Sequence, residues 1–298
     1  TNPKNGNARV VADVKKMQPL WSKFLQNKYK NIAALNHAWG TVYTSWDKIA
    51  PRVATPRYRV AIFGGCAQDF VYPEQLEACV KVLGARGVAV EYPMSQTCGL
   101  PLEMMGQRKT SVDVAKQNLD AFDASKYDAI ITLCASCASH LKHSYPQILE
   151  GKADAARVQL FADKVTDYSS FVHDVLGLTE KDFNNSGEKV TYHASCHICR
   201  GLGVTKAPRD LIADAATYVP CAEEDVCCGF GGTYSMKFPE ISGTLLAKKL
   251  KNIEATGASR VVMDCPGCVL QIRGGAEKDG KGLKVTHISE LLAENLKK

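Results

Sequence analysis

The feature that most constrains this chain is a cysteine pattern centred on Cys227-Cys228-Gly229. Two adjacent thiols followed by three glycines within four residues suit a metal site better than a packed core, because each glycine costs backbone entropy on folding. Cys196 precedes the pair, and Cys265-Pro266-Gly267-Cys268 follows it. Five thiols therefore belong to one pattern in the second half of the chain.

A less complete copy of this pattern occurs in the first half, as Cys66, Thr97-Cys98-Gly99 and then Cys134 and Cys137. The offset is 130 positions for the pairs Cys66/Cys196 and Cys98/Cys228, and 131 for Cys134/Cys265 and Cys137/Cys268. Four matched offsets are very unlikely to arise by chance, so the sequence predicts a tandem duplication. We expect an N-terminal helical arm over 1–57, a degenerate first repeat over 58–180 and an intact second repeat over 189–298.

Apolar runs in both repeats predict α/β units. Strands are expected at 58–63, 88–92, 129–133, 190–192, 217–220 and 260–263, and helices at 73–86, 110–124, 208–216 and 239–256. Most of these strands end just before a cysteine of the pattern, and open α/β sheets bind ligands at the carboxyl ends of their strands. The predicted fold class is therefore α/β, with two pseudo-symmetric Rossmann-like halves and a metal site at the strand ends of each.

Twelve cysteines are too many for an ordinary packing role. Their Cys-Cys and Cys-x-x-Cys spacings, at positions related by the repeat, favour thiolate ligation of a metal in a reducing cytoplasm over disulfide bonds. Cys79, Cys199 and Cys221 fall outside the pattern, and Cys79 fits the apolar face of a helix as a small buried side chain.

The number of thiols separates the possible metals. Four thiolates suit zinc or a cubane iron–sulfur cluster, but five exceed what one zinc ion binds. We expect a cluster with several irons in the second repeat, with the backbone at Gly229 and Gly231 close enough to hydrogen-bond to its sulfurs. The first repeat offers only four thiols, because the hydroxyl of Thr97 is a poor iron ligand. We therefore expect it to hold an ordinary cubane cluster, a zinc ion or no metal. The expected ligands are Cys196, Cys227, Cys228, Cys265 and Cys268 in the second repeat, and Cys66, Cys98, Cys134 and Cys137 in the first.

The motifs of the second repeat resemble the cysteine-rich domain often named CCG. They are Tyr192-His-Ala-Ser-Cys196-His, the run from Cys227 to Ser242, Asn252-Ile-Glu-Ala-Thr-Gly257 and Cys265-Pro266-Gly267-Cys268. The resemblance covers about 58–298. It includes the cysteine-rich subunit of heterodisulfide reductase, the iron–sulfur subunit of glycolate oxidase and the cysteine-rich subunit of lactate-utilisation complexes, and it is strongest for the lactate and glycolate branch.

The resemblance implies a cofactor and a departure from the family pattern. In heterodisulfide reductase each half holds a non-cubane [4Fe–4S] cluster through five cysteines, so the second repeat is expected to bind such a cluster. Thr97 stands where the first repeat of that family has a cysteine. Disulfide cleavage between two complete clusters is therefore less favoured for this chain.

Histidines accompany both cysteine sets. His193 and His197 flank Cys196, and His140 and His143 follow Cys137 on an expected helix. Each is either a proton donor beside a metal or a polar residue at the edge of the site. The run Lys248-Lys249-Leu250-Lys251 predicts a solvated helix face.

The N-terminal arm lies outside the duplication. Apolar residues at helical spacing predict a helix over about 8–27 and a second one over 32–39. Trp21, Trp39 and Trp46 all lie in the arm, which either packs on its own domain or docks a partner subunit. It is also compatible with the tail of a longer fused polypeptide.

Composition and charge limit the classes of function. The net charge is +6, but the lysines are scattered, which argues against a nucleic-acid partner. No apolar run approaches the about 18 residues of a membrane span, and no signal peptide opens the sequence. We expect a cytoplasmic protein that reaches a membrane only through its partners.

These observations lead to three hypotheses. The leading one is an iron–sulfur electron-transfer subunit, with or without catalysis of its own, of a complex that oxidises a 2-hydroxy acid such as lactate or glycolate. The sequence has no flavin, nicotinamide or ferredoxin motif, so the other redox steps are expected from ferredoxin-type or flavin-containing partner subunits. The alternatives are a thiol–disulfide reductase subunit of the heterodisulfide type and a zinc-binding scaffold.

Overall fold

The computed structural model describes residues 7–8, 26, 30–39, 45–46, 56–94 and 97–297. The helix predicted over 8–27 lies almost entirely outside these ranges, and at its first residue the chain forms the short strand β1 (Asn7–Ala8) instead. The helix predicted over 32–39 is confirmed as α2 (Ile32–Trp39).

The first repeat is built on a sheet with the strand order β1-β3-β2-β4-β5. Strands β2 (Tyr58–Phe63), β3 (Val88–Pro93), β4 (Ala129–Thr132) and β5 (Val165–Asp167) are parallel, and β1 runs antiparallel to β3 at the edge. Val60, at the start of the buried part of β2, pairs with Val90 on one side and Ala129 on the other. Every side chain of β2 from Val60 to Phe63 is buried, as expected of a central strand with helices on both faces.

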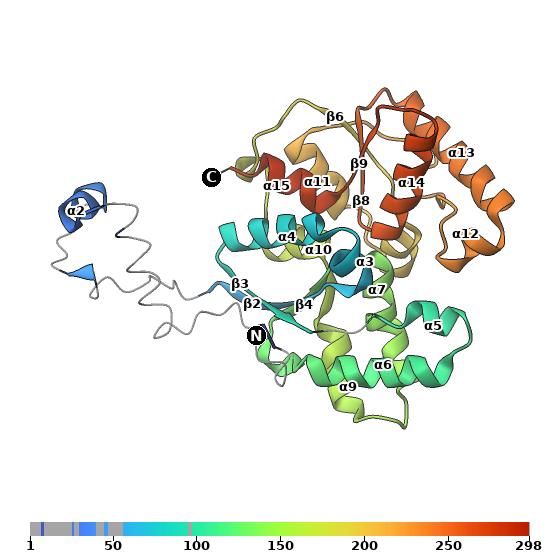
Figure 1. Ribbon diagram of the computed structural model, residues 1–298, viewed down its shortest axis with the longest axis horizontal. Coiled ribbons are helices and arrows are strands. Elements are labelled where there is room, and N and C mark those ends of the chain that lie inside the picture. Colours follow the sequence, from blue (N-terminus) through green and yellow to red (C-terminus); the bar gives the residue numbers. More distant parts are fainter. Residues whose placement is uncertain are drawn as a thin grey trace.

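The second repeat has the same arrangement of parallel strands. Its sheet has the order β7-β6-β8-β9, with β6 (Lys189–Tyr192), β7 (Thr217–Tyr218), β8 (Arg260–Met263) and β9 (Lys284–His287) all parallel. This order matches β3-β2-β4-β5 of the first repeat, so the predicted pair of α/β repeats is confirmed (Figure 1). Strand β7 is shorter than predicted and ends two residues before Pro220, which has no N–H for a sheet ladder.

The helices connect the strands and follow the cysteines. The four predicted helices are confirmed as α4 (Pro73–Ala85), α6 (Arg108–Ala121), α11 (Ala207–Ala215) and α13 (Pro239–Ala255). Short helices or turns after the cysteine-bearing loops are α3 (Gly65–Phe70), α5 (Leu100–Met104), α7 (Ala135–Ser139) and α12 (Thr233–Lys237), with the longer α14 (Pro266–Lys278). The remaining helices are α8 (Tyr145–Ile148), α9 (Ala155–Lys164), α10 (Tyr168–Ser170) and α15 (Ile288–Asn295), with π-helical turns η3 (His140–Ser144), η4 (Phe171–Val175) and η6 (His197–Gly201) and 3-10 turns η2 (Ala124–Lys126) and η5 (Glu180–Asp182).

A helix at the end of each repeat packs against a helix of the other repeat. Helix α15, at the end of the second repeat, packs against α4 of the first, while α10, at the end of the first, packs against α11 of the second (Figure 1). Lys81 Nζ donates a hydrogen bond to the carbonyl oxygen of Ala293 at 2.8 Å, and Ser289 Oγ donates to that of Gln75 at 3.0 Å. The largest core therefore lies between the repeats and fixes the relation of their sheets.

None of the helices in the described part of the chain is long and apolar enough to cross a bilayer.

Candidate metal centre

Two equivalent strands deliver the Cys-x-x-Cys segments. Cys134 follows β4 and Cys265 follows β8, and each is the N-cap residue of the next helix, α7 or α14. The second cysteine of each segment, Cys137 or Cys268, lies on that helix. Because one residue ends a strand and the other lies in the first helical turn, both sulfurs of a pair reach the same edge of the sheet.

Eight of the nine cysteines in the pattern form one continuous series of interacting side chains. In order they are Cys98, Cys137, Cys134, Cys265, Cys268, Cys228, Cys227 and Cys196. All twelve cysteines of the chain are free thiols. The structure therefore brings together three thiols of the first repeat and five of the second.

The series passes from one repeat to the other between Cys134 and Cys265. The backbone N–H of Ala135 donates to the carbonyl oxygen of Asp264 at 3.0 Å, so the two Cys-x-x-Cys loops are hydrogen-bonded to each other. Ser136 Oγ lies 3.7 Å from the sulfur of Cys265. The two thiol sets are thus adjacent.

Cys66 is the ninth thiol and is not part of this series in the described chain. Its side chain, on α3, is exposed. The backbone beside it is nevertheless close to the first set, since a Cβ added to Gly65 would lie 3.8 Å from the sulfur of Cys137. Cys66 therefore borders the first thiol set without entering it, and its role as a ligand stays a prediction.

Protons are shared along the thiol series. Side-chain interactions with Cys196 and Cys228, together with the Gly229 N–H, lower the pKa of Cys227 to about 2. Cys134 and Cys268 similarly lower the pKa of Cys265, and Cys137 lowers that of Cys98, whereas Cys227 raises the pKa of Cys228 to about 12. Buried thiols in this arrangement compete for protons, and a bound cation would stabilise them all as thiolates.

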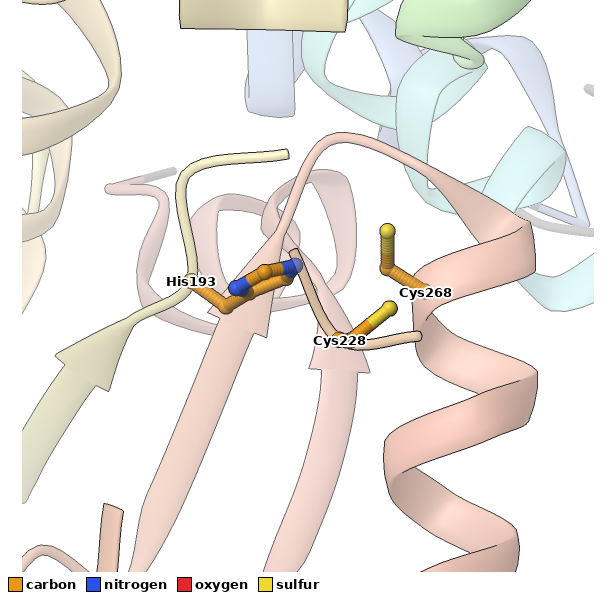
Figure 2. A group of neighbouring side chains, drawn as sticks. All are labelled: His193, Cys228 and Cys268. Carbon is orange, nitrogen blue, oxygen red and sulfur yellow. The ribbon is translucent and has the colours of Figure 1, made fainter. Parts of the chain in front are cut away.

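His193 lies against the second thiol set. A ring nitrogen of His193 and the sulfurs of Cys228 and Cys268 lie within 4.8 Å of one another, and Figure 2 shows all three side chains pointing toward one space. Both ring nitrogens are buried and make no hydrogen bond. Burial lowers the pKa of His193 to about 4, so the ring is neutral at physiological pH.

The other histidines occupy different positions. His197 Nδ1 lies 2.9 Å from Ser136 Oγ, which joins η6 of the second repeat to α7 of the first. His140 is buried beside Gly99 with both ring nitrogens unpartnered, and burial lowers its pKa to about 4. His143 is exposed. Of the four, His193 alone belongs to a group with metal-ligand spacing in the described chain.

The glycines of the Cys-Cys-Gly loop allow close packing. Gly229 has φ +89°, and a Cβ there would lie 2.6 Å from the carbonyl oxygen of Ser242 on α13. Its N–H donates to Cys227 Sγ at 3.3 Å. Gly231 has φ +51° and packs against Tyr234. The structure thus explains both glycines by backbone conformation and by the approach of the loop to its neighbours.

Two charged groups at the site are not apparent from the sequence. Lys249 is expected on a solvated face, and that expectation is wrong: its side chain is buried, and Nζ donates to the carbonyl oxygens of Glu223 and Glu224. Asp264, next to Cys265, accepts hydrogen bonds from the hydroxyls of Ser169 and Tyr192. Burial raises the pKa of Asp264 to about 7, although both hydrogen bonds act in the opposite direction.

The three cysteines outside the pattern are placed separately. Cys79 is completely buried in the core between the repeats, as predicted for a small apolar side chain. Cys199 Sγ donates to the carbonyl oxygen of Ser195 at 3.2 Å, and Cys221 is buried in an apolar cluster that also contains Cys228.

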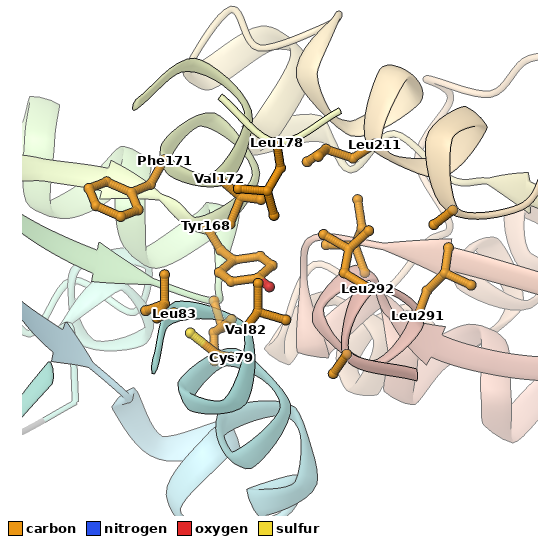
Figure 3. Packing of buried hydrophobic residues seen from close by; sticks show 14 of the residues in the cluster. Cys79, Val82, Leu83, Tyr168, Phe171, Val172, Leu178, Leu211, Leu291 and Leu292 are labelled. Carbon is orange, nitrogen blue, oxygen red and sulfur yellow. The ribbon is translucent and has the colours of Figure 1, made fainter. Parts of the chain in front are cut away.

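Packing between the repeats holds the two thiol sets in place. Tyr168 and Val172 of the first repeat face Leu211, Leu291 and Leu292 of the second, as Figure 3 shows. These side chains are almost fully buried, and truncating one of them to Ala in such a core typically costs about 2–5 kcal/mol. The separation between the thiol sets is therefore set by a well-packed interface.

The donor set fits a metal cofactor made of more than one ion. Five thiols converge in the second repeat and three adjoin them from the first, whereas one zinc ion binds four ligands. The unpartnered His193 nitrogens and the Gly229 N–H supply further polar contacts of the kind that metal sites use. The arrangement therefore has the ligand chemistry of a metal site.

Comparison with known proteins identifies the class. The family described as "CCG: Cysteine-rich domain" matches residues 60–142 and 190–273, one segment within each repeat. The chain therefore belongs to the CCG cysteine-rich domain family.

Within this family, the chain is similar to proteins named for lactate utilisation. The chain is 32% identical to "Lactate utilization protein A 1" of Bacillus anthracis over 247 residues, covering 80% of this chain and 100% of that protein. It is 35% identical to "Lactate utilization protein A" of Oceanobacillus iheyensis over 238 residues, covering 78% and 96%. Among solved structures, an aspartate racemase of Picrophilus torridus matches with a TM-score of 0.37 and 12% identity over 80% of this chain and 96% of that one, a likeness too low to bear on function.

Proposed function

We propose that this chain is an iron–sulfur electron-transfer subunit of a complex that oxidises lactate or a similar 2-hydroxy acid. The observation that carries the proposal is the continuous thiol series, in which Cys134 of the first repeat adjoins Cys265 of the second. The names of the relatives support lactate as the substrate of the complex.

Cys196, Cys227, Cys228, Cys265 and Cys268 would hold a [4Fe–4S] cluster, of the non-cubane type that the family resemblance implies. Cys98, Cys134 and Cys137, with Cys66 beside them, would hold a second cluster or a zinc ion. When bound, an iron–sulfur cluster supplies one-electron oxidation and reduction at a potential that its surroundings set.

The chain's own residues orient and tune the site. The N–H of Gly229 donates to Cys227, which stabilises negative charge on that sulfur. Lys249 places a buried positive charge behind the Cys-Cys-Gly loop and fixes the loop through the Glu223 and Glu224 carbonyl oxygens. Asp264 holds the segment before Cys265 against Ser169 and Tyr192. Five of the eight thiols are buried, which limits the access of water to the centre.

The proposal implies partner subunits. The sequence has no flavin or nicotinamide motif, so substrate oxidation and electron exit are assigned to flavin-containing or ferredoxin-type partners. The N-terminal arm, with its three tryptophans, is the candidate segment for docking them. Thiolate ligation suits a reducing compartment, and we therefore place the protein in the cytoplasm.

The test is substrate-dependent reduction in the reconstituted complex. The complex is assembled anaerobically with the wild-type chain or with Cys228→Ser, and lactate is added while the visible absorption and the electron paramagnetic resonance signal of this chain are followed. We expect lactate to change both signals in the wild type and to change them much less in Cys228→Ser. A wild-type chain that contains iron but does not respond to lactate or glycolate would contradict the proposed role.

The adjacency of the two thiol sets also favours a second candidate, thiol–disulfide reduction of the heterodisulfide type. That chemistry requires two neighbouring complete sites, and Thr97 leaves the first one thiol short. Thr97→Cys should then create or raise disulfide reductase activity and the iron content, whereas Thr97→Ser should change neither. If Thr97→Cys gains iron without disulfide reductase activity, electron transfer remains the better assignment.

A further inference from the structure

A metal ligand outside the cysteine pattern is indicated by His193, and the inference rests on the metal centre assigned under the proposed function. His193 follows β6 directly and lies three positions before Cys196. Its backbone N–H donates to the carbonyl oxygen of Val262 at 2.9 Å, so the residue is anchored to the neighbouring strand β8. Its side chain is 1% exposed.

The ring forms no well-aligned hydrogen bond with the protein. Both nitrogens of His193 are buried and unsatisfied by distance and angle, although the backbone of Glu224 lies near enough to act on the pKa of the ring. Leaving one buried polar atom unsatisfied costs about 1–3 kcal/mol, and buried side-chain polar atoms of folded proteins nearly always find a partner. A ring in this position is therefore expected to contact a group that binds between the side chains.

The space that the ring faces is bounded by two thiols of the second set. The ring nitrogen and the sulfurs of Cys228 and Cys268 lie within 4.8 Å of one another. Bonds of ~2.0–2.1 Å to nitrogen and ~2.3 Å to sulfur place ligands of one tetrahedral ion roughly 3.5–3.8 Å apart. The three atoms are thus close to the separation of ligands that share one ion, and Figure 2 shows them converging from β6, the Cys-Cys-Gly loop and α14.

The first repeat has no counterpart of this ring. The offset of 130 that relates Cys66 to Cys196 places Phe63 at the position equivalent to His193. Phe63 is fully buried and packs with Phe122, at a ring-centroid distance of 5.5 Å. A phenyl ring offers no lone pair to a metal, so the nitrogen donor is specific to the second repeat.

We propose that His193 is a nitrogen ligand of the metal centre that Cys228 and Cys268 bind. The second-repeat centre then has mixed sulfur and nitrogen ligation, whereas the first-repeat centre has thiolates alone. A nitrogen donor that bears no negative charge makes the second centre easier to reduce than an all-thiolate site of the same type.

The test labels histidine with ¹⁵N and examines the paramagnetic centre of the full-length, anaerobically purified chain by pulsed electron paramagnetic resonance. The variants are His193→Phe, which installs the residue of the first repeat, His193→Gln, which keeps a polar side chain, and His140→Phe. His140 is the matched control, because it too is buried with unpartnered nitrogens but lies beside Gly99 of the first repeat. Iron and sulfide are measured on every sample.

We expect the strong coupling of a directly bonded ¹⁵N in the wild type and in His140→Phe, and its loss in His193→Phe and His193→Gln. Iron in the wild type without such a coupling, or a coupling that persists in both His193 variants, would overturn the inference and leave the proposed function intact. A weak coupling typical of a hydrogen-bonded ring would also overturn it. Absence of iron from the wild type would instead refute the proposed function.

Discussion

Asp264 offers a direct test of how the two repeats are held together at the metal centre. Its carboxylate is 3% exposed and accepts hydrogen bonds from Ser169 of the first repeat and Tyr192 of the second, the latter at 2.6 Å. Asp264→Ala leaves both hydroxyls buried without an acceptor, and each costs about 1–3 kcal/mol. At a pH below 7, where Asp264 is mostly protonated and its own burial cost is small, we therefore expect a loss of about 4 kcal/mol in the free energy of unfolding.

This loss is measurable as a fall in melting temperature. For domains of 150–250 residues, 1 kcal/mol shifts the midpoint by ~2–4 °C, so a fall of roughly 8–16 °C is expected. The melt is recorded by calorimetry on the reduced chain in the presence of a chelator, so that metal binding does not contribute. Asp113→Ala, on the exposed face of α6, is the matched control and should leave the midpoint nearly unchanged.

A double variant separates lost hydrogen bonds from other effects. Adding Tyr192→Phe to Asp264→Ala removes one of the two orphaned hydroxyls, so the double variant should be more stable than Asp264→Ala alone. If Asp264→Ala melts like Asp113→Ala, or if Tyr192→Phe lowers the midpoint further in that background, the carboxylate does not join the repeats in the way described.

Three further predictions follow from single sites. Gly229→Ala should destabilise the chain by about 1–3 kcal/mol, because φ is +89° and a Cβ would lie 2.6 Å from the Ser242 carbonyl oxygen. Gly243→Ala is the control and should not destabilise the chain, since the space around Gly243 is open. Thermal melts of both variants test this. Lys249→Met should lower the reduction potential of the bound centre, since it removes a buried positive charge. Redox titration of this variant and of the control Lys251→Met, on the exposed side of the same helix, measures the difference. Burial acts to lower the pKa of His173, but Asp174 and Asp210 outweigh it and raise that pKa above its ordinary value of 6.5. The stability that the His173–Asp210 pair contributes is therefore full below pH 6.5 and is lost as the pH rises through the raised pKa. His173→Gln should flatten this part of a profile of melting temperature against pH, and an unchanged profile would contradict the assignment.

The sequence predicts those features that depend on local pattern or on duplication. The apolar run Tyr58–Phe63 forms the expected central strand, and the constant cysteine offset corresponds to two sheets of the same strand order. Strand β1 is not predicted, since two residues carry no periodicity. An offset shows that two segments are alike but not that they touch, so the contact between Cys134 and Cys265 is visible only in the folded chain.

Features of the site that depend on burial are also beyond the sequence. Lys249 lies in a lysine-rich run, and its burial follows from the approach of the Glu223–Glu224 loop to α13. His193 is one of four candidate histidines, and only its distance to Cys228 and Cys268 distinguishes it from the others. Cys66 satisfies the repeat spacing, yet its side chain is exposed on α3, because the spacing fixes the residue's place along the chain but not the direction of its side chain.

Binding of an iron-containing centre by the second-repeat thiols is tested most directly by the iron, zinc and acid-labile sulfide content of the anaerobically purified chain. The wild type should contain iron and sulfide in equal amounts, Cys228→Ser should lose a large share of both, and Cys199→Ser, which alters a thiol outside the pattern, should retain them. A wild-type chain that contains zinc without sulfide, or a Cys228→Ser chain with full iron and sulfide, would contradict iron–sulfur binding by these thiols.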